Sequence, residues 1–216
     1  MTRFRIVLAS SSPARLKTLR ATGVFPEVLV PGVDETTDAP DTQSRVRAVA
    51  QRKGEAAQAL LGTPKQSTVL IAADTMLDIG GVSYGKPHDA GVARDRLHAM
   101  SGSSGVLYTG HYAAVAPAGG SWRHAVEVAS TVVHFARMTD DEIEAYLATG
   151  EPLEVAGSFT IDGFGGPFIT GIEGDPHNVV GLSLPLLRVM LAGLDVPWTS
   201  LWATTRRARL LASRIL

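Results

Sequence analysis

A short segment near the N-terminus carries residue types that bind anions in proteins. Ser10 and Ser12 precede Pro13, and Arg15 follows two residues later. Ser12 suits the N-cap of a helix and Pro13 its first position, so free backbone N–H groups and the positive end of a helix dipole would meet here. Arg15 adds a planar, permanently charged group that matches phosphate oxygens. The segment predicts an anion site, and ordinary helix capping with a solvated arginine is the alternative.

A lysine occupies the apolar face of the next predicted helix. Val46, Val49, Lys53, Ala57 and Leu60 are spaced 3, 4, 4 and 3 residues apart, which places them on one side of a helix. An unpaired ammonium is costly to bury, so Lys53 either meets an anionic partner or extends outward from the edge of this face. The first alternative predicts a cation directed into a cleft.

Two acidic positions are candidates for the same cleft. Asp74 follows the apolar run of residues 68–73, so we expect it at the carboxyl end of a strand, where open α/β sheets bind ligands. A carboxylate there holds a divalent cation or takes a proton from water, and a turn or N-cap aspartate is the alternative. Asp34 and Glu35 lie in a loop before a helix, as a second carboxylate or as a solvated acidic turn.

Lys86 ends a pattern that is similar to a phosphate-binding loop but departs from it at one position. Residues 80–86 fit G-x-x-x-x-G-K, yet Pro87 stands where a serine or threonine hydroxyl would bind magnesium. We therefore reject a P-loop and interpret residues 85–87 as a rigid turn that presents one lysine. The sequence has no G-x-G-x-x-G, H-E-x-x-H or nucleophile-elbow pattern, and its histidines show no metal-ligand spacing.

The elements that carry these residues alternate along the chain between predicted strands and predicted helices, which indicates an α/β fold. We expect one two-lobed domain over residues 1–216, since no change of composition marks a linker. The predicted strands are residues 5–9, 27–30, 68–73, 106–117 and 125–137, with short strands around a glycine-rich turn in 154–170. The predicted helices are residues 14–22, 44–61, 89–100, 139–149, 178–192 and 199–216, and Thr139 with Glu142 fits a capping box.

The composition excludes several classes of function. Of the 216 residues, 45% are hydrophobic and 19% charged, as in packed globular proteins. Lysine and arginine total 20 against 21 acidic residues, which argues against a general nucleic-acid or membrane-surface binder. The absence of cysteine excludes disulfides, thiolate metal sites and cysteine nucleophiles. No segment reads as a secretory signal or a membrane span, so we expect a cytoplasmic protein.

The order of these motifs resembles that of the Maf family of nucleoside triphosphate pyrophosphatases. The resemblance covers roughly residues 5–192, and the joint order and spacing of its short motifs are specific. The stretches that carry it are ASSSPAR at 9–15, GVDE at 32–35, Lys53 in its helix, ADT at 73–75, GKP at 85–87, YTG at 108–110, AGSF at 156–159 through DG at 162–163, and NVVGL at 178–182.

The resemblance implies a curved mixed sheet with flanking helices and two lobes around a central cleft, as in Maf and inosine triphosphate pyrophosphatases. It also implies hydrolysis of a nucleoside triphosphate to the monophosphate and pyrophosphate with Mg²⁺ or Mn²⁺. Asp74 matches the family's general base. The positions that match its polar cleft residues are Arg15, Glu35, Lys53 and Lys86.

These implied roles agree with the chemistry of the residues. The donors of Ser10 and Ser12 would position phosphates whose charge Arg15, Lys53, Lys86 and the cation offset. Asp74 would accept the proton of the attacking water or bind the cation that activates it. Glu35 would be a second cation contact.

Departures from the family pattern leave the base preference open. Ala14 stands where many members have the first of two arginines. Asp162 stands where members that prefer dTTP and UTP have glutamine, whereas Thr75 fits that subgroup. The chain also differs at positions 75 and 162 from the subgroup that resembles 7-methyl-GTP enzymes. Thr75 and Asp162 are therefore candidate substrate contacts.

Two other functions stay open at this point. Maf relatives are associated with inhibition of septum formation, so one alternative is a non-catalytic, nucleotide-sensing regulator of cell division. The other is a kinase or NTPase that cleaves the terminal phosphate through residues 80–86. A homodimer is suggested only by the resemblance.

Overall fold

A mixed sheet organises the molecule. The structure is a computed structural model that describes residues 4–203, and within them seven strands form one sheet. The strands are β1 (Arg5–Ala9), β2 (Glu27–Val28), β3 (Thr68–Ile79), β4 (Val82–Tyr84), β5 (Ser104–Ala116), β6 (Arg123–Phe135) and β7 (Ile169–Glu173). Their order is β2-β1-β3-β5-β6-β7, with β4 beside β3. The pairs β1–β2 and β1–β3 are parallel and the others antiparallel.

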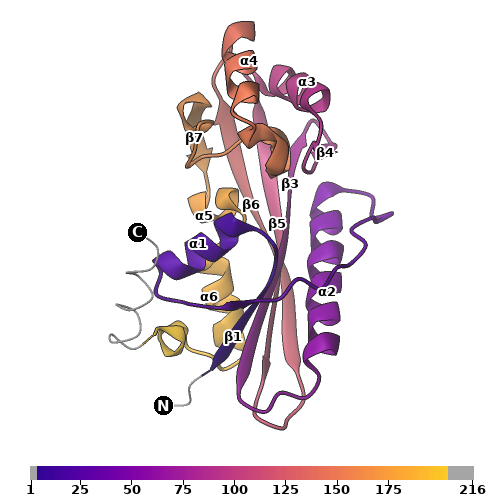
Figure 1. Cartoon of the computed structure of the whole chain (residues 1–216), viewed down its shortest axis with the longest axis vertical. Coiled ribbons are helices and arrows are strands. Elements are labelled where there is room, and N and C mark those ends of the chain that lie inside the picture. The colour runs from indigo at the N-terminus through magenta and orange to yellow at the C-terminus, as the bar shows by residue number, and fades with distance from the viewer. Residues whose placement is uncertain (1–3, 204–216) are drawn as a thin grey trace.

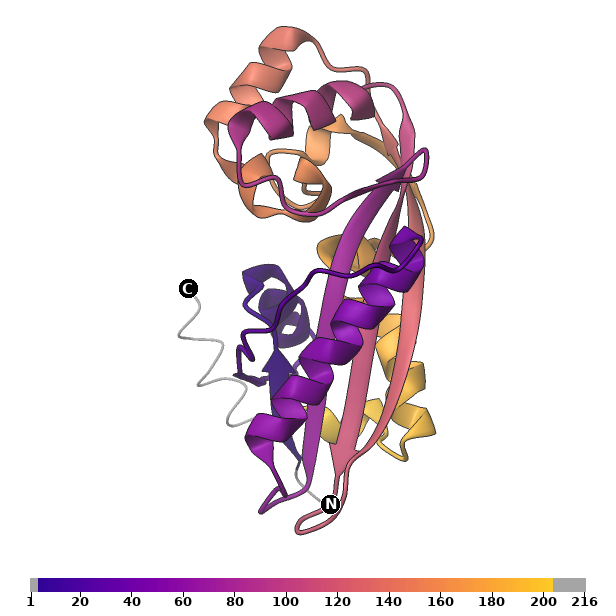
Figure 2. The ribbon, with the colours of Figure 1, turned by 90° about the vertical axis from the view of Figure 1, so that its right-hand side faces the viewer.

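Helices cover both faces of this sheet. They are α1 (Pro13–Ala21), α2 (Thr42–Leu61), α3 (Ala90–Met100), α4 (Asp140–Ala148), α5 (Pro176–Val180) and α6 (Leu184–Gly193), with the 3₁₀ helices η1 (Glu151–Glu154), η2 (Ala156–Ser158), η3 (Gly166–Phe168) and η4 (Trp198–Leu201). α2 lies on one face and α1 and α6 on the other, while α3 and α4 pack at the far end of the long strands (Figure 1, Figure 2). None of the helices in residues 4–203 is long and apolar enough to cross a bilayer.

Three apolar cores correspond to these layers. Successive strand side chains alternate between faces, so Ile6 and Leu8 of β1 pack toward α1 and α6 whereas Val7 and Ala9 pack toward α2. The third core lies at the far end of the sheet and joins Leu77 to side chains of α3, α4 and η2–β7. The cleft described below opens between this third core and the first two.

Local helix signals agree with the structure. Ser12 is the N-cap of α1 and Pro13 its first residue, and the capping box of Thr139 and Glu142 begins α4. The predicted α/β fold class, a mixed sheet with flanking helices, is confirmed.

The predicted strand over 68–73 is correct but too short, and the segment type predicted for 154–170 is wrong. Residues 68–73 are only half of β3, which continues to Ile79 because β5 pairs with it from Thr68 to Asp78. Residues 154–170 form 3₁₀ turns rather than short strands, and only Ile169 and Thr170 belong to a strand. In both cases polar residues or glycines obscured a structure that tertiary pairing determines.

The predicted helix over residues 178–192 is also wrong, because it is two helices. Gly181 ends α5 with a φ of 105°, and Ser183 caps the start of α6. The helix predicted over 199–216 begins in η4, a single 3₁₀ turn that ends at Leu201, and its residues from 204 onward lie outside the described part of the chain.

Candidate active site

The cleft opens where one edge of β3 has no strand beside it. β1 pairs with β3 as far as Ala9 opposite Ala72, and β4 pairs with β3 from Leu77 onward. Between these points, residues 73–76 have a strand neighbour only on the β5 side within the described chain. A cleft of about 670 Å³ lies along this gap. Asp74 therefore lies beside the carboxyl end of β1, which corrects its predicted place at the end of its own strand.

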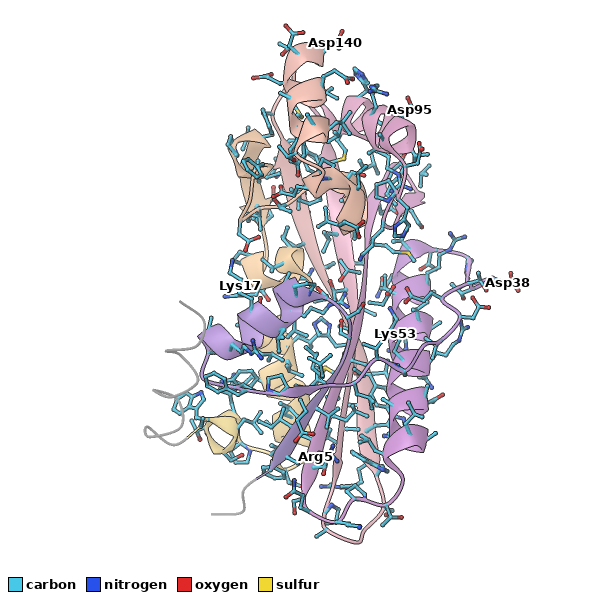
Figure 3. The ribbon with its side chains drawn as sticks, in the orientation of Figure 1. Arg5, Lys17, Asp38, Lys53, Asp95 and Asp140 are labelled. Carbon is cyan, nitrogen blue, oxygen red and sulfur yellow. The ribbon has the colours of Figure 1, made fainter. Side chains whose placement is uncertain are left out.

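Asp74 faces α2, where it meets the lysine predicted to need an anionic partner. Lys53 Nζ lies 2.8 Å from Asp74 Oδ1 and 2.8 Å from Glu35 Oε1. The side chains of Lys53 and Asp74 are 12% and 8% exposed, and Lys53 lies midway along α2 (Figure 3). The second oxygen of Asp74, Oδ2, is buried and accepts no hydrogen bond within residues 4–203. One carboxylate oxygen at the cleft is thus left for a ligand or a proton.

Two glycines allow α2 to approach the sheet closely enough for this contact. A Cβ on Gly54, next to Lys53, would stand 2.1 Å from Cδ1 of Tyr112 on β5. A Cβ on Gly110, which pairs with Asp74 in the sheet, would stand 2.1 Å from the carbonyl oxygen of Val46 on α2. The helix backbone therefore lies directly on β5 beside Asp74.

Arg15 lies on the opposite face of β3, beside Thr75. Its Nε donates to the Gly181 carbonyl at 2.7 Å, and Nη1 donates to Ser10 Oγ at 3.1 Å and to the Ala73 carbonyl at 2.8 Å. Its Nη2 donates to Thr75 Oγ1 at 2.8 Å. A guanidinium has five N–H groups, so four of them point at protein acceptors. Most of the guanidinium N–H groups that the sequence suggested for binding phosphate therefore donate to acceptors within the protein.

The charge of Arg15 is balanced by acids on the other side of β3. Burial lowers the pKa of the guanidinium, while the carboxylates of Asp74 and Glu35 act in the opposite direction. Arginine nevertheless remains charged in proteins. The wall of the cleft therefore contains a buried positive charge.

The start of α1 forms the adjoining wall. Ser12 Oγ accepts the backbone N–H of Arg15 at 3.4 Å, and Ser10 Oγ accepts the backbone N–H of Ser12 at 3.2 Å. Residues 9–15 all line the cleft. The N-terminal end of this nine-residue helix thus faces the hollow, where its dipole favours anions.

A buried histidine supports the same wall from behind. His111 Nδ1 lies 3.0 Å from the Thr109 carbonyl, which can only accept, so Nδ1 carries the proton. Its Nε2 accepts the backbone N–H of Ser183 at 2.8 Å. Burial lowers the pKa of His111 to about 4, with a smaller effect from the charge of Arg15. The neutral ring therefore fixes the turn after Gly181. Sequence reasoning missed this role, because histidine spacing carries no sign of it.

The remaining predicted site residues also line the cleft. Thr75 Oγ1 accepts from Arg15 and lies 3.0 Å from Thr109 Oγ1. Lys86 is exposed and forms no ion pair within the described residues, and it follows the β3–β4 hairpin whose turn is Gly80 and Gly81. Asp162 forms an exposed ion pair with Lys17 of α1, 3.2 Å between Nζ and Oδ2. Figure 3 shows Lys17 on that helix.

Glu151 organises the wall that carries Asp162, and no motif or spacing in the sequence indicates this role. Its carboxylate accepts hydrogen bonds from the Tyr146 hydroxyl at 2.9 Å and the Thr160 hydroxyl at 2.6 Å. It also accepts the backbone N–H groups of residues 164 and 165, each at 3.1 Å. Burial raises its pKa, but these hydrogen bonds outweigh burial and the pKa is lowered.

The oxygen donors at the cleft suit a hard cation, although they are few. Asp74 and Glu35 share the ammonium of Lys53 through Oδ1 and Oε1, and Asp74 Oδ2 has no hydrogen-bond partner among the described residues. No group of three or more His, Cys, Asp or Glu side chains converges anywhere in residues 4–203. Mg²⁺ commonly binds through one or two carboxylates plus substrate phosphates and water, so the donor set fits such an ion together with a phosphate ligand.

Known proteins are similar to this chain over most of its length. The family model described as "Maf-like protein" matches residues 5–194. A "Nucleoside triphosphate pyrophosphatase" of Salinispora tropica is 52% identical over 201 residues, which are 92% of this chain and 88% of that protein. The protein of the same description from Streptomyces coelicolor is 50% identical over 93% of this chain and 96% of that protein.

Among solved structures, the Staphylococcus aureus Ham1 protein aligns with 61% of this chain and 72% of its own, at 13% identity and a TM-score of 0.36. A likeness this low supports no conclusion about the cleft.

Proposed function

We propose a mechanism from the premise that this chain belongs to the family of Maf-like proteins and is a nucleoside triphosphate pyrophosphatase, a hydrolase of acid anhydrides. The reaction converts a nucleoside triphosphate and water to the monophosphate and pyrophosphate. In the proposal it takes place in the cleft beside residues 73–76 of β3. The observation that carries it is the pairing of Lys53 with one oxygen of Asp74, while the other oxygen has no hydrogen-bond partner among residues 4–203.

In this proposal the triphosphate binds against the start of α1. Ser10 and Ser12 lie at that helix end, where N–H groups and the helix dipole favour phosphate oxygens. Lys86 is exposed at the cleft without an ion pair in the described chain, so its ammonium is available to the phosphates. Lys53 and the buried charge of Arg15 lower the electrostatic cost of bringing a polyanion here.

Asp74 is proposed as the general base. Water attacks the α-phosphorus, its proton passes to Asp74 Oδ2, and the bond to the bridging oxygen breaks so that pyrophosphate leaves. Lys53 holds Oδ1 of the same carboxylate at 2.8 Å, which fixes the direction of Oδ2. The ammonium also offsets charge that develops on the attacked phosphate.

A divalent cation is part of the proposal. Glu35 would hold it, together with Asp74 in the alternative in which that carboxylate binds the cation instead of the proton. Their shared contact with Lys53 keeps the two carboxylates close together. When bound, Mg²⁺ or Mn²⁺ supplies charge neutralisation on the phosphates and lowers the pKa of a coordinated water. The role of Lys53 is to prevent repulsion between the two acids before substrate arrives.

Thr75 and Asp162 are proposed to contact the nucleoside part of the substrate. Asp162 accepts hydrogen bonds when ionised, and Thr75 carries a hydroxyl. Both residues line the cleft along with apolar side chains such as Val30 and Val179. Apolar walls with a few polar groups are typical of sites that bind a base.

We further propose that residues 1–216 work as one unit, because β3 and β5 contribute to cores on both sides of the cleft. A cytoplasmic location, a homodimer and the lack of a nucleic-acid partner stay predictions.

The deciding experiment is a panel of ATP, GTP, CTP, UTP, dTTP and methylated or deaminated analogues, with and without Mn²⁺, and with identification of the product. Pyrophosphate with the monophosphate supports the proposal. Orthophosphate would point to cleavage of the terminal phosphate. Binding of nucleotides without any product would favour a regulatory protein.

A further inference from the structure

Arg15 lines the cleft, but four of its five guanidinium N–H groups donate to other residues of the protein. We propose that Arg15 is a positioning residue: it holds Ser10 so that the serine hydroxyl donates to a substrate phosphate, and does not bind that phosphate through its own guanidinium fork. The inference rests on the proposed function and assigns to Arg15 a role different from that of Lys86.

The hydroxyl of Ser10 already accepts two hydrogen bonds, so it can act further only as a donor. A hydroxyl has two acceptor sites and one donor. Ser10 Oγ accepts from Arg15 Nη1 at 3.1 Å and from the backbone N–H of Ser12 at 3.2 Å. Within the described part of the chain only its O–H remains without a partner, and Ser10 lines the cleft. Because ionised phosphate oxygens accept hydrogen bonds, the remaining capacity of Ser10 matches a phosphate.

The charge of Arg15 strengthens this donor. A hydrogen bond from a charged group to a hydroxyl oxygen polarises the hydroxyl, so that its own proton is donated more strongly. Arg15 is 8% exposed and Ser10 is 7% exposed, so water screens this effect little. The effect of the positive charge at the cleft surface is therefore a more strongly donating hydroxyl on Ser10.

The guanidinium cannot easily turn toward the substrate. Its other bonds reach the carbonyl of Ala73 at the unpaired edge of β3, the carbonyl of Gly181 and the hydroxyl of Thr75. Gly181 has a φ of 105°, and a Cβ there would stand 3.3 Å from Arg15 Nε. Arg15 thus joins the segment after β1, the middle of β3 and the end of α5. Moving it would take this donor away from two buried carbonyl groups, which is costly.

A double-mutant cycle tests the inference. We expect Arg15→Lys and Ser10→Ala each to raise KM about tenfold for the fastest substrate of the panel, with kcat within about threefold, because Asp74 and Lys53 are intact. In the Ser10→Ala background, Arg15→Lys should raise KM less than about twofold further. The cycle of Lys86→Ala with Ser10→Ala serves as control and should be additive.

Full additivity of Arg15→Lys with Ser10→Ala would overturn the inference, as would an unchanged KM for Arg15→Lys. If Arg15→Lys does not fold, the cycle of Ser10→Ala with Thr75→Val decides. These two hydroxyls are both held by Arg15, so the inference expects non-additive changes in KM, and additive changes would overturn it. Throughout, the wild-type protein must release pyrophosphate. If the wild-type protein releases no pyrophosphate, the proposed function is wrong. If it releases pyrophosphate but the KM changes of the cycle are additive, only the role of Arg15 is wrong.

Discussion

Lys53 Nζ holds Asp74 Oδ1 at 2.8 Å, and the other oxygen of that carboxylate is buried at the cleft without a hydrogen bond in residues 4–203. An acceptor left unpaired in a protein interior costs free energy, typically about 1–3 kcal/mol. Such an atom is compatible with a stable fold when a ligand or a transferred proton satisfies it during function. This arrangement underlies the first prediction.

Asp74→Asn should lower kcat for pyrophosphate release by about 10²–10⁴-fold, the usual contribution of a general base. The amide keeps the shape of the side chain but accepts no proton at neutral pH. The measurement is steady-state kinetics over a range of Mn²⁺ concentrations. Asp78→Asn, on the same strand and outside the cleft lining, is the matched control and should retain activity. Rescue of Asp74→Asn by excess Mn²⁺ would mean that the carboxylate is only a cation ligand.

The two cleft lysines should differ in what they affect. Lys53→Ala leaves a buried carboxylate without its counter-ion, so we expect a loss of about 3 kcal/mol of stability and a fall in kcat as well as a rise in KM. Lys86→Ala should raise KM alone and leave the unfolding midpoint unchanged, since Lys86 is exposed. Urea denaturation and kinetics of both variants, with the exposed Lys65→Ala as control, make the comparison. Equal stability of the two cleft variants would refute the buried pairing.

Stability should decrease in mild acid because of His111. Its pKa is lowered to about 4 in the folded protein, against about 6.5 in the unfolded chain. The unfolded state therefore binds the proton more readily between these values. The stabilising contribution is complete above about pH 6.5 and is lost as the pH falls toward 4, by about 3 kcal/mol at most.

Denaturation of wild type and His111→Gln at several pH values checks this prediction. The glutamine variant should be less stable at pH 7 and should lose the part of the pH dependence between 6.5 and 4. A wild-type slope that persists in His111→Gln would assign the titration to another group.

Gly110→Ala should disrupt the contact between α2 and β5. The new Cβ would stand 2.1 Å from a backbone carbonyl, which no side-chain rearrangement can relieve, so we expect a loss of at least about 3 kcal/mol together with loss of activity. Gly193→Ala is the control, because a Cβ there would meet no atom of residues 4–203 within 4 Å. A Gly110→Ala protein with wild-type stability and kinetics would show that α2 does not need this close approach.

The sequence allowed good prediction wherever a short-range rule applies. Ser12 and Thr139 begin their helices as their side chains require, and the spacing of Val46, Val49 and Lys53 places that lysine on the buried side of α2. The cost of burying an ammonium alone left two alternatives for this side chain, an anionic partner or extension outward. The ion pairs with Asp74 and Glu35 show the first.

Long-range pairing could not be read in the same way. The extension of β3 past Ala73 depends on β5, which lies more than thirty residues further along the chain. The four bonds accepted by Glu151 come from residues whose spacing has no period. The engagement of Arg15 by Gly181 joins residues that are 166 positions apart. Residue type identified these side chains as charged, whereas only the fold determines which of them face a ligand.

The ladder between β3 and β5 also has a mechanical consequence. Because it runs unbroken past the cleft from Thr68 to Asp78, a hinge between the two halves would have to tear consecutive main-chain bonds. We therefore expect the floor of the cleft to be rigid and its width to change little when a nucleotide binds. If the cleft changes shape to fit a nucleotide, we expect the change in the non-strand segments that line it, residues 30–33 and 159–162.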